Sequence, residues 1–227
     1  MRALVMLLMV SVSTAQAGEP KELRYLRLAG DEWVPESTLS RKRDKGESVY
    51  VSVTDRGTEK MTLTLRHDGK GQLLAAEARQ QIGKSKKTAS LTMQGKWAIL
   101  KREGGITEQF MLPTNPVVTT APDWSDILEV LRRYDRGRGG KQEFPGFWIH
   151  PVQPPRVLTF TVEKLGEDSL VAKERKVSLG RYRVVLRSGG YLVWADAVGL
   201  VYKLMPVDRP AGAVVLEGFE EASGALK

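Results

Sequence analysis

The sequence has no cysteine and only 2 histidines among its 227 residues. Without cysteine the chain has no thiol nucleophile, no disulfide framework and no thiolate ligands for an iron–sulfur cluster or a zinc knuckle. Two histidines leave little for a histidine-based metal site. A chain of this length buries roughly 70% of its unfolded surface and needs neither a disulfide nor a metal to fold. We therefore expect a globular protein that holds no metal and no cofactor.

Long apolar runs are equally scarce, and the one that exists lies at the N-terminus. Arg2 is followed by the apolar run Ala3–Val12 and then by the small-residue pattern Ala15-Gln16-Ala17. The run is too short to cross a bilayer, which needs about 20 apolar residues. It has the pattern of a secretory signal peptide, residues 1–17, cleaved after Ala17. No cysteine follows to carry a lipid anchor, so we expect residues 18–227 to form a single periplasmic or secreted domain.

Most of the remaining chain alternates between apolar and polar residues. Val49, Val51 and Val53 share one face of a predicted strand, and Ser48, Ser52 and Thr54 share the other. Such alternation is typical of antiparallel strands with one buried and one solvated face. Glycine-containing turns separate successive strands. Further strands are predicted at Met61–Leu65, Leu73–Gln81, Thr88–Gln94, Trp97–Arg102, Thr107–Leu112, Leu158–Val162, Tyr182–Leu186, Tyr191–Ala195, Leu200–Met205 and Ala213–Glu217.

The apolar period changes once, and this change predicts a helix over about 123–135. Asp123 is the expected N-cap, and Gly137 follows the expected end. Because only one strong helix is present, it should lie across the concave face of a curled sheet. The predicted fold is mainly β: an antiparallel meander forming a half-barrel or incomplete barrel, with one main α-helix over the concave face. One helical face collects Trp124, Ile127, Leu128, Leu131 and Tyr134.

This organisation resembles the periplasmic lipoprotein-carrier family (LolA/LolB-like) and its uncharacterised envelope relatives. The residues that carry the resemblance are the signal peptide, the long meander, the Pro122–Asp135 helix, and a closing hairpin made by Tyr191–Asp196 and Leu200–Leu204. The resemblance implies a convex sheet with an apolar concave pocket that holds an acyl chain or a similar ligand. The missing lipid-anchor cysteine argues against a membrane-tethered receptor. No functional residue of the carriers is transferred to this chain.

The pocket implied by this resemblance would be lined by large apolar side chains. Tryptophan is the most informative, since the chain holds 5 of them, and aromatic side chains line both cores and ligand pockets. The alternative is ordinary core packing, with the predicted loop Lys141–Pro155 folding in to fill the space. The candidate ligand-binding residues are Trp97, Trp124, Ile127, Leu128, Leu131, Phe147, Trp148 and Trp194.

Basic side chains outnumber acidic ones, 35 to 27, and several are clustered. A solvated surface is the simplest interpretation of such clusters. The functional alternative is contact with an anionic membrane surface, to which each basic residue contributes about 1 kcal/mol. Nucleic acid is the usual partner of basic proteins, but export to the envelope argues against it. The candidate contact residues are Arg41, Lys42, Arg43, Lys84, Lys86 and Lys87.

These patterns favour a non-catalytic envelope protein that binds a lipid or another apolar or amphiphilic small ligand. Two alternatives stay open. The protein could be a structural partner of other envelope proteins, or an enzyme on the same scaffold that uses His150 as a general base. His150 follows aromatic residues near a predicted strand end, where a packed, structural histidine is also common, and His67 sits in a predicted turn, where a solvated histidine is expected.

Overall fold

The computed structural model describes residues 22–120, 125–172, 175–186, 189–208 and 212–220. The predicted signal peptide, Asp123 and Trp124 lie outside these described residues. Within them, fifteen strands form one sheet in the order β8-β7-β6-β5-β4-β3-β2-β1-β15-β14-β13-β12-β11-β10-β9. All neighbours are antiparallel except β9 and β10, which are parallel. The mainly β, largely antiparallel fold with one helix is therefore confirmed.

The strands are unequal in length. Those of the first meander are β1 (Glu22–Ala29), β2 (Glu32–Asp44), β3 (Glu47–Asp55), β4 (Glu59–His67), β5 (Leu73–Ile82), β6 (Ser85–Gln94), β7 (Trp97–Arg102) and β8 (Thr107–Met111). A short 3-10 turn, Glu103–Gly105, lies between the last two. The others are β9 (Val117–Thr119), β10 (Lys141–Trp148), β11 (Arg156–Ala172), β12 (Arg175–Leu186), β13 (Gly189–Ala195), β14 (Val201–Pro206) and β15 (Val214–Leu216).

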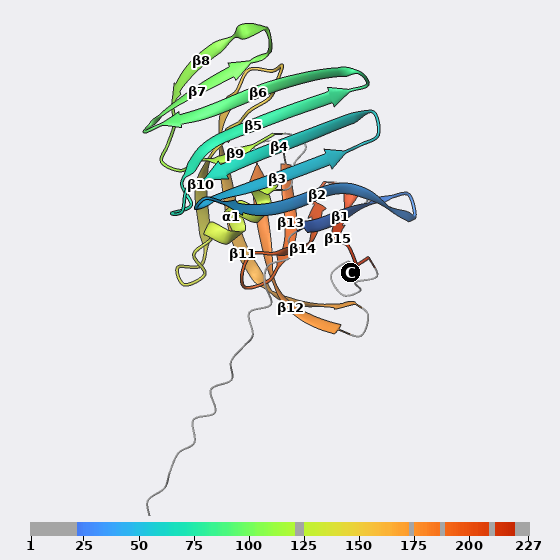
Figure 1. The fold of residues 1–227 in the computed structure, drawn as a ribbon. Coiled ribbons are helices and arrows are strands. Elements are labelled where there is room, and N and C mark those ends of the chain that lie inside the picture. The colour runs from blue at the N-terminus through green and yellow to red at the C-terminus, as the bar shows by residue number, and fades with distance from the viewer. Residues whose placement is uncertain (1–21, 121–124, 173–174, 187–188, 209–211, 221–227) are drawn as a thin grey trace, which may run out of the picture.

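The sheet curls until its two edges approach each other. Figure 1 shows the strands β2–β8 lying across the strands β10–β14, with the helix α1 between these two layers. The edge strands β8 and β9 are consecutive in the chain, and side chains rather than a hydrogen-bond ladder bridge the gap. Phe110 on β8 packs on Phe147 of β10 with ring centroids 5.4 Å apart. Val118 and Ile149 join Leu91 and Leu100 in the same apolar cluster.

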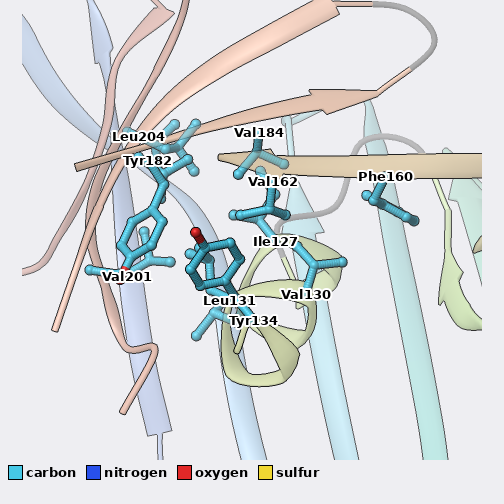
Figure 2. Packing of buried hydrophobic residues seen from close by; sticks show 14 of the residues in the cluster. Ile127, Val130, Leu131, Tyr134, Phe160, Val162, Tyr182, Val184, Val201 and Leu204 are labelled. Carbon is cyan, nitrogen blue, oxygen red and sulfur yellow. The ribbon is translucent and has the colours of Figure 1, made fainter. Parts of the chain in front are cut away.

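Helix α1 (Ser125–Arg133) confirms the predicted helix and lies on the concave side of the sheet. Ile127, Val130 and Leu131 are at most 1% exposed and pack on β11, β12 and β14, as Figure 2 shows. Tyr134, just past the helix, meets Tyr182 edge-to-face at 5.5 Å. Among the described residues, no helix is long and apolar enough to cross a membrane.

The two faces of β3 alternate as predicted, but the face that is buried is the polar one rather than the valine one. Ser52 and Thr54 are buried, whereas Val51 and Val53 are only partly buried. Directly opposed residues of neighbouring strands project to the same side of a sheet. Ser52 lies opposite Leu63 of β4, whose side chain faces the interior. The register with its neighbours, rather than the hydrophobicity of β3 itself, therefore decides which face of β3 points inward.

The prediction that Lys141–Pro155 forms a loop was wrong, because Lys141–Trp148 forms strand β10. Pro145 and Gly146 in this segment predict a turn. However, β9 pairs with β10 only from Gly146 to Trp148, so β10 is an edge strand at Pro145. A proline without an amide hydrogen is tolerated at an edge position. At Gly146 a Cβ would lie 2.3 Å from a Leu158 side-chain carbon, so glycine is required there by close packing.

The first prediction concerns the buried helix face. Leu131→Ala should lower the free energy of unfolding by about 2–5 kcal/mol, because it leaves a cavity between α1 and the sheet. Leu165→Ala makes the same change at a residue that is 41% exposed and should cost less than about 0.5 kcal/mol. Urea denaturation of both variants measures the difference. Equal midpoints would show that α1 does not contribute to the core.

Candidate functional site

A cavity of about 460 Å³ lies between α1 and the inner face of β2, β3 and β4. Its strand side and its helix side both carry leucine and arginine side chains. It is the candidate functional site. The lining residues are Leu39, Arg41, Arg43, Gly46, Glu47, Ser48, Tyr50, Leu65, His67, Asp68, Gly69, Gly71, Ser125, Leu128, Glu129, Arg132 and Arg133.

The strand residues of the lining come from two cross-strand rows. In the first row Arg43 lies opposite Ser48, which lies opposite His67. In the second row Arg41 lies opposite Tyr50, which lies opposite Leu65. Side chains two residues apart on a strand project to the same face, so the two rows stack along the wall. The register of three strands thus places two arginines, a tyrosine and a histidine together.

Tyr50 lies at the centre of the charged side chains of the lining. The guanidinium of Arg41 lies 5.3 Å from its ring centroid and that of Arg132, on the helix, lies 5.9 Å from it. Both distances are within the range of cation–π attraction. The ring of His67 meets the Tyr50 ring edge-on at 5.6 Å. The aromatic ring therefore holds arginines from β2 and from α1 around one space.

His67 is buried, with 7% of its side chain exposed, and is not the solvated turn residue expected from the sequence. It is the last inward-facing residue of β4, after Met61, Leu63 and Leu65. Its Nε2 lies 3.6 Å from Oε1 of Glu129 on the helix. Its Nδ1 is buried and makes no hydrogen bond. A buried polar atom without a partner costs free energy, so a group that reached this nitrogen would relieve that cost.

Each carboxylate of the lining has a partner, although Oε2 of Glu129 is buried without a hydrogen bond. Glu47 forms an ion pair with Arg66 at 2.7 Å, outside the lining. One oxygen of Asp68 accepts hydrogen bonds from the backbone of its own turn. Glu129 pairs with Arg133 four residues further along the helix. In the part of the chain that the structure describes, no group of three or more histidine, aspartate or glutamate side chains could hold a metal ion.

Two hairpin turns form one rim of the cavity. In the β2–β3 turn, Lys45 and Gly46 have positive φ angles of 46° and 85°, the backbone of a type I′ hairpin turn. In the β4–β5 turn, a Cβ at Gly69 would lie 3.3 Å from the carbonyl oxygen of Gly46. The two turns are therefore in contact, and this contact fixes the rim beside His67.

The predicted ligand-binding residues do not converge on this cavity. Of the predicted eight, Leu128 lines it, Trp124 lies outside the described residues, and the other six are not in the lining. Ile127 and Leu131 lie on the helix face that packs in the core of Figure 2. Phe147 closes the sheet edges, and Trp148 stacks on His150. Trp97 is 47% exposed on β7 rather than facing the concave core.

Trp194 is buried, but in a separate apolar cluster with Leu170 and Leu179. Its indole donates a hydrogen bond of 2.9 Å to Asp168 of β11. Lys203 on β14 is 2% exposed, and its amine lies 5.3 Å from the Trp194 ring centroid. Burial lowers the pKa of this amine below its usual value. Trp194 therefore packs beneath the far end of the β11–β12 hairpin and not in a concave pocket.

The predicted basic residues do not form one surface, because they lie on two faces and at two ends of the sheet. Arg41 and Arg43 face the cavity, whereas Lys42 between them is exposed on the opposite face of β2. Lys84 and Lys86 lie at the β5–β6 turn. This turn is next to Glu59, the first residue of β4, because Ile82 of β5 lies opposite Glu59. Arg43 lies near the other end of β4, because it is opposite Ser48 of β3, which is opposite His67, the last residue of β4. Lys87 belongs to the same cluster as Lys84 and Lys86. This cluster and the Arg41–Arg43 cluster thus lie at opposite ends of the strands.

His150 is placed as a structural residue. Its Nδ1 accepts hydrogen bonds from the backbone amides of Val152 and Gln153, at 3.1 and 3.2 Å. Its ring stacks on Trp148 at 5.3 Å, and Arg156 lies over the same indole. Burial lowers the pKa of His150. The nitrogen that a general base would use to take a proton is therefore occupied by the turn that follows β10.

Sequence reasoning missed Tyr50, His67 and Glu129 as members of a site. The signal that could have found the site is Arg41-Lys42-Arg43, since two arginines separated by one residue share a face if the segment is a strand. That inference needs β2, which the sequence did not predict because its second half is rich in charged residues. Glu129 and Arg132 are recognisable only once the helix is placed against β3.

Comparisons with known proteins show likeness in fold alone. A beta-barrel-like protein of the domain of unknown function DUF1849 from Brucella abortus aligns with a TM-score of 0.51 over 86% of this chain and 92% of that one, at 8% identity. A DUF1089 family protein from Pseudomonas aeruginosa aligns with a TM-score of 0.47 over 73% and 87%, at 16% identity. No protein-family model and no curated protein matches the sequence. The likeness to lipoprotein carriers expected from the sequence is not shown by these comparisons.

The second prediction tests the structural role of His150. His150→Leu leaves two backbone amides without their acceptor and should cost about 1–3 kcal/mol of stability. His150→Asn retains a side-chain acceptor and should cost less. Because burial lowers the pKa of His150 in the folded state, the unfolded state binds more protons near its unfolded value of about 6.5. The stability of the parent should therefore fall as the pH drops below about 6.5.

Urea denaturation of the parent and both variants, near pH 7 and near pH 5, checks these expectations. The part of the stability loss between pH 7 and pH 5 that comes from His150 should be absent from both variants. A leucine variant as stable as the parent at both pH values would contradict the assigned hydrogen bonds.

Proposed function

We propose that this protein is a non-catalytic binding protein of the bacterial envelope, exported through its N-terminal segment, whose cavity holds an amphiphilic small molecule. The observation that supports the proposal is the cavity between α1 and β2–β4. Its volume of about 460 Å³ falls within the range of roughly 300–1,000 Å³ that is usual for small-molecule sites. Its lining combines an apolar surface with a few convergent polar groups, which is the usual composition of such sites.

The apolar part of the lining supports a ligand with a hydrocarbon portion. Leu39, Leu65 and Leu128 are all less than 8% exposed and line the cavity from two strands and from the helix. An apolar group placed against them would be removed from water, which contributes about 25 cal/mol for each Å² of buried apolar surface. The arginines around Tyr50 line the same cavity as these leucines and can bind the polar end of the same molecule.

The segment expected to fill a concave pocket does not enter this cavity. Lys141–Trp148 is a strand of the sheet, and His150 fixes the turn that follows it. Neither contributes to the lining. The resemblance to lipoprotein carriers, which implies a concave pocket for an acyl chain, agrees with the proposal as an expectation from the sequence. The alternative of a structural partner in an envelope complex is left to the experiment.

The third prediction tests occupancy of the cavity. A dansyl-labelled fatty acid should give a saturable increase in fluorescence when it is titrated into the full chain. Ser48→Phe places a large ring in the cavity and should weaken this binding by about tenfold or more, equivalent to about 1.4 kcal/mol. Val49→Phe is the matched control. It makes the same replacement at the next residue, which lies opposite Lys42 and Arg66 on the other face of β3.

Thermal melts show whether each variant is folded. If neither the dansyl-labelled fatty acid nor a lysophospholipid binds the folded parent, the binding function is wrong and the structural-partner alternative is preferred. If both variants weaken binding equally, the ligand does not occupy this cavity.

A further inference from the structure

We infer that the cavity selects amphiphiles whose head is a phosphate monoester, bound by Arg41, Arg43 and Arg132 together with His67. This inference rests on the proposed function, since it assigns the head of the molecule whose apolar part contacts the leucines. In Figure 1, β2 and β4 lie on either side of β3, and α1 lies between these strands and the strands β10–β14. The four residues of the set thus come from three separate elements, β2, β4 and α1.

The charge of the lining points to an anion. Four arginines line the cavity against three carboxylates. Arg133 is paired with Glu129 inside the lining, and the Glu47 carboxylate is paired with Arg66 outside it. Arg41 and Arg43 lie two residues apart on one face of β2, so their Cα atoms are separated by about 7 Å. Both side chains line the cavity, and Arg41 also lies over the Tyr50 ring. Cationic side chains gathered on one wall attract an anionic group.

His67 provides a second, independent observation. Its side chain is 7% exposed and its Nδ1 has no hydrogen-bond partner. The imidazole lines the same cavity and lies in the same cross-strand row as Arg43. A neutral histidine carries one donor nitrogen and one acceptor nitrogen. Because Nε2 faces the Glu129 carboxylate, it takes the donor role, so Nδ1 can donate to an oxygen of the ligand only when both nitrogens carry a proton.

The number and spread of these donors favour phosphate over carboxylate. A phosphate monoester carries a charge of about −1.5 to −2 near pH 7 and three acceptor oxygens. A carboxylate carries one charge and two oxygens in one plane. Arginine binds phosphate through paired, charge-assisted hydrogen bonds. Arg41 from β2 and Arg132 from α1 approach the Tyr50 ring, and Arg43 lines the same cavity, so donors from two elements suit a tetrahedral head rather than a planar one.

The fourth prediction compares ligands that share one hydrocarbon chain. Dodecyl phosphate, dodecanoate and dodecanol are used to displace the dansyl-labelled fatty acid from the full chain at low ionic strength. Dodecyl phosphate should bind about tenfold more tightly than dodecanoate, and dodecanol more weakly than both. Inorganic phosphate, titrated alone, should compete at least about a hundredfold more weakly than dodecyl phosphate because it buries no hydrocarbon.

Two variants assign the preference to the arginines. Arg43→Gln and Arg132→Gln alter exposed residues of the rim, so the fold should be retained. Each should reduce the preference for dodecyl phosphate over dodecanoate about fivefold or more, because each removes a charged donor. Lys42→Gln removes the same charge from the outer face of β2 and is the control. It should leave the preference unchanged.

Each contrary result has a distinct meaning. Equal affinity for the three dodecyl ligands would overturn the head-group assignment and leave the proposed binding function intact. A phosphate preference that survives both arginine variants would place the head elsewhere. Inorganic phosphate binding as tightly as dodecyl phosphate would make this a site for free phosphate rather than for an amphiphile. Failure of every ligand, including the dansyl-labelled fatty acid, would overturn the proposed function itself.

Discussion

The burial of helix α1 inside the curled sheet is the interaction on which the rest of the structure depends. A helix of nine residues is about 14 Å long, far too small to cover the inner face of a sheet of fifteen strands. It packs its apolar side on β11, β12 and β14 (Figure 2). Its other side, with Glu129 and Arg132, faces β2–β4 across the cavity. The site is therefore the space that one short helix cannot fill.

The curl of the sheet is held by side-chain packing at its edges. β8 and β9 are consecutive in the chain and lie at opposite ends of the strand order. Phe110 and Phe147 meet across the gap, and Arg102 donates to the carbonyl oxygen of Val152 beyond β10. Short edge strands limit pairing with other chains, and here they have three and five residues. This closure keeps the layer that carries Arg41 and Tyr50 in front of the helix.

The inner surface of β2 and β3 departs from the rule that inward-facing residues are apolar. Arginine, serine and tyrosine occupy its inward positions next to the cavity, and half-buried valines occupy the outward positions of β3. A sequence that breaks the local pattern at one place while following it elsewhere is typical of functional sites. In the C-terminal layer the inward residues, such as Val162 and Val184, are apolar as the pattern requires. The wall that faces the charged side of α1 is one of the places where this departure occurs.

The sequence alone determined the fold class, the helix and most of the strands, because periods of two and of 3.6 residues are properties of short segments. It could not predict β2, whose charged second half obscures the alternation, or β10, where Pro145 is tolerated at a local sheet edge. Only the tertiary structure decided the site. His67, Tyr50 and Arg132 come from three elements, and their meeting depends on strand register and on the angle of α1 against the sheet. Neither quantity is encoded in any one segment, since both follow from how distant segments pack together.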